Sequence, residues 1–462
     1  MSLVAGIDLA TQSTKVVVCD ADSGEILRTG QAPHPDATEV EPAIWYDAFA
    51  AASVGLLDGV AAIGVAGQQH GMICLDERGE VVRPALLWHD VRPADAAAEL
   101  VAELGGPAAW ARTVGSVPVA SFTVTKLRWF ARAEPKLADR TASVLLPHDW
   151  LTELLRDGGD GLPTTDRGDA SGTGYWSPAS GTYRPDLVEL AFGRELALPR
   201  VAGPAEVVGE TARGAALSAG TGDNMGAALG LGLRPGEAVV SIGTSGTVFA
   251  VAEHPVADPS GAVAGFADAS GRYLPLVCTL NAARVLTAAA SLLAVPLSTV
   301  DDLALSAEPG AGGLTLLPYL DGERTPNLPA ARGLLAGLTR ANATPANLAR
   351  AAVEGMLCGL ADGLDALRGQ NVAVDRILLV GGGAGSAAVR ALAPALFGVE
   401  VAVPAPAEYV ALGAARQAAW ALAGSAEPPA WPVTTREIAA EPADHVRDAY
   451  AEVRARAAAL LG

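Results

Sequence analysis

The chain has 462 residues, of which 50% are hydrophobic and 18% are charged, so it can bury enough apolar surface to offset the entropy of ordering. The formal net charge is −19, and such a negative field argues against nucleic acid as a partner. The four cysteines form no CxxC pair, which disfavours a zinc site or a disulfide framework. No apolar run reaches the roughly 18 residues of a membrane span, and no basic leader opens the chain, so we expect a cytoplasmic protein.

The first predicted element is a β-hairpin with a polar tip. Residues 3–9 form a short apolar strand interrupted by Asp8, and residues 15–20 form a strand rich in β-branched side chains. Backbone N–H groups and hydroxyls in such a tip can bind anions. A carboxylate such as Asp8 is costly to bury without an interacting group, and a hydrated Mg²⁺ or the amides of the turn could equally provide one. The turn consists of Thr11, Gln12, Ser13 and Thr14.

Polar clusters follow two predicted strands of the first half. Gln69 and His70 come after an apolar strand at residues 61–66, and their donors and acceptors suit polyol hydroxyls. Trp88 begins a second cluster, and its ring could stack on a ligand. Without further evidence, a structural histidine and a capped strand end explain both clusters more simply.

A polar stretch and a glycine-rich stretch complete the first half. Residues 158–185 are rich in Gly, Thr, Ser and Asp, which predicts an exposed loop. Asp223 is followed by Asn224 and lies among glycines that let a substrate approach its carboxylate. An ordinary Asp–Gly turn and a base that acts on a substrate hydroxyl both fit this pattern.

The strand–turn–strand plan returns later in the chain. A strand, a turn containing Gly243 and Thr244, and a second strand follow one another over residues 237–251. We interpret the two hairpins as a structural duplication. The predicted domains are therefore residues 1–233 and 234–462.

A long helix and a glycine-rich turn follow in the second domain. Thr344 as N-cap and apolar residues at helical spacing predict an amphipathic helix over about 345–368. A buried strand at 376–380 leads into the glycines of 381–383. Strands that alternate with helices indicate an α/β architecture.

Two common phosphate-binding signatures are missing. No GxxxxGK[ST] sequence occurs, so a P-loop is excluded. Ser386 stands where a dinucleotide fingerprint needs its third glycine, which disfavours a nicotinamide or flavin enzyme. Phosphate is therefore expected at the two hairpin tips, and a packing turn without a ligand also explains residues 381–383.

Taken together, the chain resembles the FGGY family of carbohydrate kinases over almost its whole length, and within it the branch that acts on xylulose. The segments that carry the resemblance occur in the family's order and are residues 6–13, 67–71, 88–92, 121–132, 146–151, 222–224, 241–246, 319–326, 333–354 and 381–384. The chain departs from the family pattern at Ala10, Gln69, His89, Ala133 and Gly385.

The resemblance implies two actin-like, ribonuclease-H-like α/β domains with an interdomain cleft, and transfer of the ATP γ-phosphate to the C5 hydroxyl of D-xylulose. Asp223 would be the general base, and Asp8 would place Mg²⁺ through water. The implied sugar-binding residues are Gln69, His70, Trp88, Asp223 and Asn224. The implied nucleotide-binding residues are Thr11, Gln12, Ser13, Gly243, Thr244, Gly382, Gly383 and Ala384.

The residues leave three alternatives open. A sibling kinase could act on another ketose or polyol, such as ribulose or gluconate. A non-catalytic sugar-binding protein could keep the same fold, although the retained Asp8 and Asp223 speak against it. The dinucleotide oxidoreductase is the third. The expected partners are a small sugar and ATP, and the resemblance allows a homodimer for which no stretch of sequence identifies an interface.

Overall fold

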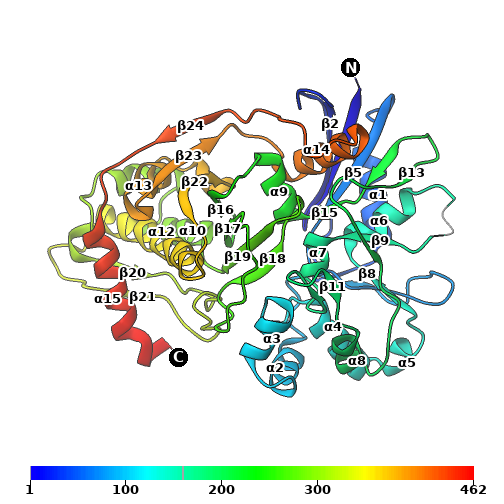
Figure 1. The fold of residues 1–462 in the computed structure, drawn as a ribbon. Coiled ribbons are helices and arrows are strands. Elements are labelled where there is room, and N and C mark those ends of the chain that lie inside the picture. Colours follow the sequence, from blue (N-terminus) through cyan, green and yellow to red (C-terminus); the bar gives the residue numbers. More distant parts are fainter. Residues whose placement is uncertain (1, 159–160, 462) are drawn as a thin grey trace. The chain divides into compact units, whose positions relative to one another are not determined.

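A sheet with strand order β13-β14-β5-β1-β2-β3 forms the centre of the first of two units in this computed structural model, which describes residues 2–158 and 161–461. The first unit comprises Met1–Leu233, Glu253–Leu274 and Pro406–Val433. Figure 1 shows its strands in blue and green. The sheet strands are β1 (Leu3–Leu9), β2 (Ser13–Asp20), β3 (Ile26–Pro33), β5 (Val60–Gly67), β13 (Val207–Glu210), β14 (Ala216–Ser218) and, beside β5, β15 (Thr221–Gly222).

Helices and short ribbons surround this sheet. The helices are α1 (Ala43–Ala52), α2 (Ala94–Glu103), α3 (Pro107–Val114), α4 (Thr123–Ala133), α5 (Pro135–Ala138), α6 (Pro147–Leu155), α7 (Arg167–Ser171), α8 (Pro185–Phe192), α9 (Asp223–Leu231) and α14 (Tyr409–Ala423). The paired short strands are β4 (Glu39–Val40) with β7 (Ala85–Leu86), β6 (Ile73–Leu75) with β8 (Ser143–Leu145), β9 (Thr164–Asp166) with β12 (Arg200–Ala202), and β10 (Trp176–Ser177) with β11 (Thr182–Tyr183).

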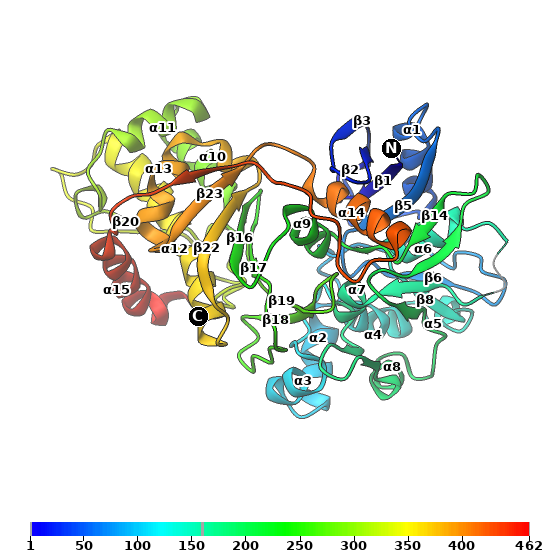
Figure 2. The same ribbon diagram turned by 45° about the horizontal axis from the view of Figure 1, so that its top comes forward.

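Helix α14 returns from late in the chain and packs on β1 and β5 (Figure 2). The approach is close, because a Cβ at Gly6 would overlap the carbonyl oxygen of Ala411, and one at Gly64 would overlap that of Ala414. Glycine is therefore required in the sheet where the helix lies on it. The opposite face of the sheet is covered by α1, whose Trp45 joins its hydrophobic core.

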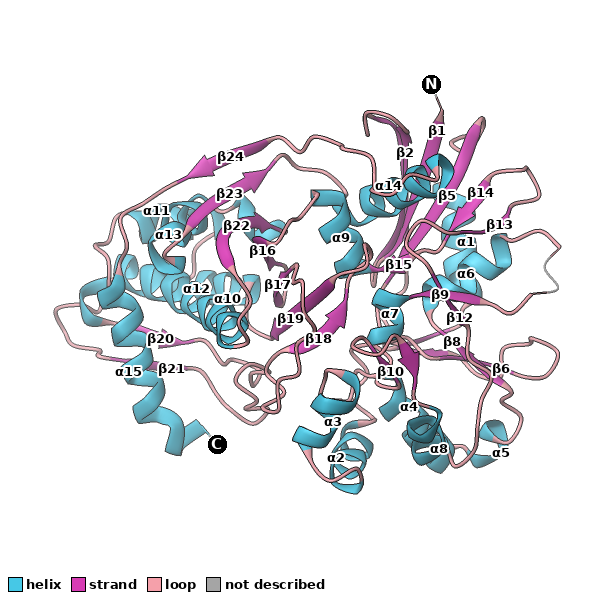
Figure 3. Ribbon diagram, in the orientation of Figure 1, coloured by secondary structure: helices cyan, strands magenta, loops and turns pink. Residues whose placement is uncertain are grey.

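The second unit comprises Arg234–Ala252, Pro275–Ala405 and Thr434–Gly462. Its sheet has the order β19-β17-β16-β22-β23-β24, flanked by helices (Figure 3). The sheet strands are β16 (Gly236–Ile242), β17 (Gly246–Ala250), β19 (Tyr273–Thr279), β22 (Val374–Val380), β23 (Glu400–Pro404) and β24 (Thr435–Ile438). Strands β20 (Thr315–Leu317) and β21 (Leu334–Ala336) form a separate antiparallel pair. Strand β18 (Ala264–Ala267) belongs to a segment of the first unit. The helices are α10 (Ala283–Leu293), α11 (Leu297–Leu305), α12 (Pro345–Gly369), α13 (Ala387–Phe397), α15 (Asp444–Leu461), and the 3₁₀ turns η1 (Ala311–Gly313) and η2 (Gly382–Gly385).

The two sheets repeat one topology. In the first, β1 pairs antiparallel with β2 and parallel with β5; in the second, β16 pairs antiparallel with β17 and parallel with β22. This repeat confirms the predicted duplication. The predicted helix at 345–368 is also confirmed as α12, where the Thr344 side chain accepts a hydrogen bond from the backbone of Asn347.

Two expectations about chain organisation differ from the structure. The boundary drawn at residue 233 placed Glu253–Leu274 and Pro406–Val433 in the C-terminal domain, whereas both segments pack with the first unit. The prediction that residues 158–185 form an exposed loop is wrong for most of the described part, because β9 and α7 are buried. Residues 159 and 160 lie outside the described residues. The polar side chains of this stretch are buried because they bond to one another and to neighbouring elements.

Among the helices of the described residues, none taken singly is long and apolar enough to cross a membrane. Helices α10 and α11 together meet that criterion of length and composition only as a pair bent by 88°.

Candidate active site

Asp8 is a carboxylate built into the central strand β1, and only 3% of its surface is exposed. Its neighbour on β2 is Lys15, whose Nζ donates to Oε2 of Glu408 at 2.6 Å. Oδ1 of Asp8 is buried and has no hydrogen-bond partner among the described residues. Burial raises the pKa of Asp8 to about 7, opposed by Lys15 and reinforced by Asp223 and Glu408. A nearby hydrated cation such as Mg²⁺ fits this unpartnered carboxylate.

Side-chain hydrogen bonds hold the tip of the β1–β2 hairpin. Trp88 Nε1 donates to Oγ1 of Thr11 at 2.9 Å, so this indole supports the tip. Ser13 begins β2, and its hydroxyl accepts a hydrogen bond from Gln31 Nε2 at 3.1 Å. Gln12 is exposed. Of the three predicted tip residues, Gln12 therefore has the most open side chain, while the hydroxyls of Thr11 and Ser13 already accept hydrogen bonds.

Asp223 is the first residue of α9 and directly follows β15. Its Oδ1 accepts hydrogen bonds from the backbone nitrogen of Asn224 at 2.7 Å and from Asn224 Nδ2 at 2.8 Å. Burial raises the pKa of Asp223 to about 6, and the bonds from Asn224 limit the rise. Such a carboxylate is mostly ionised at neutral pH and still basic enough to accept a proton, as a general base must.

Gln69 and His70 follow β5 and reach the start of α9. Asn224 Nδ2 donates to Oε1 of Gln69 at 3.4 Å, which joins the two elements. His70 has a φ of 68°, which a residue with a side chain adopts at an energetic cost. Its Nδ1 lies 2.6 Å from the carbonyl oxygen of Gly172, and because a carbonyl only accepts, Nδ1 carries the proton in this contact. We call Gln69, His70, Asp223 and Asn224 the Asp223 cluster.

Two phenylalanine rings lie against His70. The Phe122 ring stacks on the imidazole with centroids 4.8 Å apart and an interplanar angle of 30°, and the Phe266 centroid lies 5.8 Å away. Phe266 reaches this place through the segment Glu253–Leu274 of the first unit. Sequence reasoning missed both rings, because a lone phenylalanine looks the same in a core and in the wall of a site.

The short helix α7 joins both sides of the Asp223 cluster. Its N-cap Asp166 accepts a hydrogen bond from Thr221 Oγ1 at 3.0 Å, just before the start of α9. Asp169 within the helix has its Oδ2 2.7 Å from Nδ1 of His148. The glycine that follows the helix supplies the carbonyl bonded by His70. These acidic residues were not selected from the sequence, although two aspartates in a Gly/Thr-rich stretch were a usable signal.

In the second unit, the two predicted nucleotide motifs lie against each other. The turn between β16 and β17 contains Gly243 and Thr244, and Arg284 Nε donates to the carbonyl oxygen of Thr244 at 3.3 Å. The glycine-rich turn after β22 packs onto the end of β16, where a Cβ at Gly383 would overlap the side chain of Ile242. The structure thus brings together motifs that are about 140 residues apart in sequence.

The glycine-rich turn leads into a capped helix. The Ser386 side chain accepts a hydrogen bond from the backbone of Val389 at 3.1 Å and caps α13. Gly382 has open space where a Cβ would lie, whereas Ala384 is buried. Gly385 is equally open, so Gly382 and Gly385 are the two positions where a ligand could come close to the backbone of this turn.

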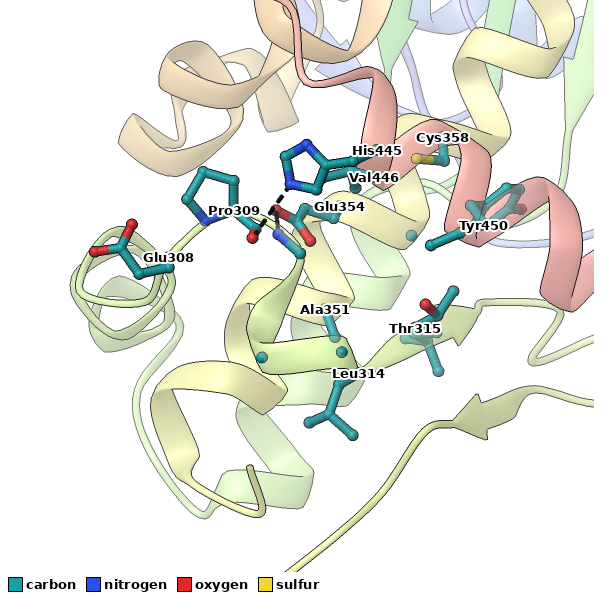
Figure 4. A pocket seen from close by; sticks show the side chains of 16 residues that line it. Glu308, Pro309, Leu314, Thr315, Ala351, Glu354, Cys358, His445, Val446 and Tyr450 are labelled. Atoms are coloured by element: carbon teal, nitrogen blue, oxygen red, sulfur yellow. Dashed lines mark hydrogen bonds between the residues drawn. The ribbon is translucent and has the colours of Figure 1, made fainter. Parts of the chain in front are cut away.

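A cavity of about 260 Å³ lies elsewhere in the second unit, between β20, α12 and α15 (Figure 4). Its wall includes Cys358, His445 and Glu354, and none of the predicted site residues lines it. Oε1 of Glu354 accepts hydrogen bonds from the backbone of Gly310 at 3.0 Å and from Nε of Arg350 at 2.6 Å. Its buried carboxylate is therefore already satisfied, and the cavity is separate from the predicted motifs.

Comparison with known proteins shows to which protein family the chain belongs. The chain matches the N-terminal domain of the FGGY family of carbohydrate kinases over residues 3–232 and the C-terminal domain over residues 238–422. It therefore belongs to the FGGY family of carbohydrate kinases. The expected two-domain, actin-like fold and the expected ATP-dependent sugar kinase are confirmed. The oxidoreductase alternative is wrong.

Three individual proteins show which members of this family the chain is similar to. The chain is 47% identical over 438 residues to a xylulose kinase of Streptomyces coelicolor, covering 91% of this chain and 88% of that protein. It is 46% identical over 456 residues to a xylulose kinase of Streptomyces rubiginosus, covering 95% and 92%. The crystal structure of xylulose kinase from Bifidobacterium adolescentis has a TM-score of 0.93 and 44% identity, covering 98% and 99%.

Proposed function

We propose that this chain is a xylulokinase, which transfers the γ-phosphate of ATP to the C5 hydroxyl of D-xylulose and forms D-xylulose 5-phosphate and ADP. The names of the relatives at 46% and 47% identity support this substrate. The observation that carries the proposal is the Asp223 cluster, where a carboxylate with a pKa of about 6 lies beside side chains that suit a polyol. A sibling activity on ribulose or gluconate is the alternative that a substrate panel tests.

Asp223 is the proposed general base. Its carboxylate accepts the proton of the C5 hydroxyl while the hydroxyl oxygen forms a bond to the γ-phosphorus. The bond between the γ-phosphorus and the bridging oxygen breaks, and ADP leaves with that electron pair. Asn224 keeps the base ionised and oriented through its two hydrogen bonds to Oδ1. Most of the rate enhancement then comes from positioning and electrostatic stabilisation.

The sugar is held by the remaining members of the Asp223 cluster in this proposal. The case for a contact with the sugar is strongest for Gln69. Its Nε2 is buried without a hydrogen-bond partner among the described residues and can donate to a hydroxyl of the sugar. His70 offers its imidazole ring to the sugar. Its backbone has a φ of 68°, and Thr123 Oγ1 donates a hydrogen bond to its carbonyl oxygen, which helps to hold that conformation. Trp88, which lies outside this cluster, is also proposed to contact the sugar from beside the hairpin tip, where its indole nitrogen donates to Thr11.

The two polar turns and the glycine-rich turn bind ATP in this proposal. Their dipoles carry no formal charge, which reconciles phosphate binding with a net charge of −19. Mg²⁺ would be held through water by Asp8 and, when bound, would neutralise charge on the phosphates. The residues proposed for ATP are Thr11, Gln12, Ser13, Gly243, Thr244, Gly382, Gly383 and Ala384.

We further propose that the protein acts in the cytoplasm and forms a homodimer, as the family resemblance allows. Light scattering of the purified protein at several concentrations tests the oligomeric state. A monomer at all concentrations would refute the dimer and leave the kinase proposal unaffected.

A coupled ADP-release assay over D-xylulose, ribulose, gluconate and glycerol tests the activity. We expect D-xylulose to give the highest kcat/KM, and mass spectrometry to find a pentulose monophosphate. The matched control is Asp223→Asn, which preserves shape and removes the base. If no sugar raises ADP release above this variant, the kinase proposal is wrong. If ribulose or gluconate exceeds D-xylulose by a large factor, only the substrate is wrong.

A further inference from the structure

Lys126 is a fully buried basic side chain in the first unit. Its side chain on α4 has no exposed surface, and it takes part in no ion pair among the described residues. Burying an ammonium in this way is costly unless its donors are satisfied. Burial lowers the pKa of Lys126 to about 7, opposed by Asp90. Among the lysines and arginines of the described residues, Lys126 is the most deeply buried, so it needs a specific explanation.

Two backbone carbonyls satisfy the ammonium. Nζ of Lys126 donates to the carbonyl oxygen of His70 at 2.9 Å and also to the carbonyl oxygen of Ser121. His70 is 56 residues away in sequence and belongs to the Asp223 cluster. Ser121 directly precedes Phe122, whose ring stacks on the His70 imidazole. The ammonium therefore bridges the backbones that carry the two stacked rings.

The carbonyl of His70 belongs to a strained residue. His70 has a φ of 68°, and such a backbone persists only where its surroundings hold it. Thr123 Oγ1 donates to the same carbonyl at 3.2 Å. The first turn of α4 thus holds His70 through a ring stack and through two hydrogen bonds to one oxygen atom.

We infer that Lys126 is a positioning residue for the sugar: its ammonium ties the carbonyls of His70 and Ser121 together and fixes the imidazole against Phe122. This inference rests on the proposed function, because it needs His70 to contact the sugar. Lys126 itself touches no reacting atom. Its loss changes the orientation of the His70 ring and weakens sugar binding, while the nucleotide motifs of the second unit keep their geometry.

The decisive variant is Lys126→Met, which keeps the length and packing of the side chain and removes all three donors. We expect the KM for D-xylulose to rise about tenfold or more, as for loss of a hydrogen bond from a charged donor. The KM for ATP and kcat should stay within about threefold, because the base and the ATP site are untouched. Lys136→Met is the matched control, since Lys136 is exposed and its loss should change none of these constants.

A merely structural lysine would give a different result. Its loss would lower the melting temperature and the active fraction, and hence the apparent kcat, with the sugar KM unchanged; that result would overturn the inference. If Lys126→Met does not fold, Thr123→Val removes the weaker donor to the same carbonyl and should raise the sugar KM about threefold. An unchanged sugar KM there also refutes the inference. A wild-type protein that phosphorylates no sugar refutes the proposed function instead.

Discussion

Nδ1 of His148 lies 2.7 Å from Oδ2 of Asp169, and both side chains are completely buried. The other ring nitrogen of His148 lies 3.2 Å from Oδ1 of Asp149, which is also buried. Burial by itself lowers the pKa of His148, but the neighbouring carboxylates raise it to about 9. The imidazole is therefore a buried cation between two acids, beneath the ends of β5 and β15, where a Cβ at Gly67 or Gly220 would meet its side chain.

Replacing this imidazole should destabilise the first unit. His148→Ala leaves Asp149 and Asp169 buried without their cation, and breaking a buried pair in this way costs about 3 kcal/mol or more. Thermal unfolding measures the effect. His254→Ala is the control, because His254 is exposed and its loss should change stability by less than about 0.5 kcal/mol. Equal melting temperatures for the two variants would contradict the ion-pair interpretation.

The contribution of His148 to stability should fall as pH rises above neutrality, whereas the lowered pKa of Lys126 acts in the opposite direction over the same range. The folded-state pKa of His148 is about 9, above its ordinary value of 6.5, so its contribution is complete below pH 6.5 and is lost as pH rises through 9. Denaturant unfolding between pH 6.5 and 9.5 measures this loss. Because Lys126 titrates in both proteins, the comparison isolates His148: relative to the wild-type protein, His148→Gln should lose less stability, or gain more, as pH rises over that range. An identical pH dependence in both proteins would refute the assignment.

Activity should depend on the ionisation of Asp223. Its pKa is raised to about 6, and the protonated acid cannot accept a proton, so kcat/KM should fall as pH drops below about 6. Asn224→Ala removes a hydrogen bond that favours the charged form, so the pKa should rise and the acidic limb should move to higher pH. Asp8 titrates in both proteins, and the difference between their pH profiles therefore reports Asp223. No displacement of the limb would argue against Asp223 as the base.

Phe266 should contribute to sugar binding although it comes from the segment that follows β17. Phe266→Leu weakens the ring packing around His70, and the loss of one aromatic pair should raise the KM for D-xylulose about three- to tenfold. Phe249→Leu is the control for loss of a buried ring, since Phe249 lies in β17 of the second unit. That variant should lower the melting temperature without a change in the sugar KM, and the same pattern in Phe266→Leu would refute the prediction.

The close packing of α14 on the sheet can be tested with one methyl group. Gly6→Ala places a Cβ against the backbone of Ala411, and overpacking of this kind costs about 1–3 kcal/mol. Gly369→Ala is the control, because nothing lies near a Cβ at the end of α12 and alanine is the better helix former. Unfolding in denaturant should therefore separate the two variants in opposite directions. Equal stabilities would show that the helix can move away from the sheet without cost.

The sequence by itself determined the features that depend on neighbouring residues. Strands rich in β-branched residues and polar turns predicted the β1–β2 and β16–β17 hairpins, and the Thr344 cap with apolar spacing predicted α12 within one residue of its end. Asp8 was selected as a carboxylate inside an apolar strand and Asp223 as a carboxylate among glycines, and the order of the motifs along the chain supported both. These patterns involve residues close together in the sequence, so they can be recognised without knowledge of the fold.

Only the tertiary structure decided which buried polar groups meet. His70 bonds a carbonyl 102 residues away, and Lys126 reaches His70 across 56 residues. The polar composition of residues 158–185 predicted exposure, yet Asp169 in that stretch is buried because it pairs with His148. A polar side chain is stable inside a protein only when a partner satisfies it, and that partner is chosen by the fold and not by its distance along the chain.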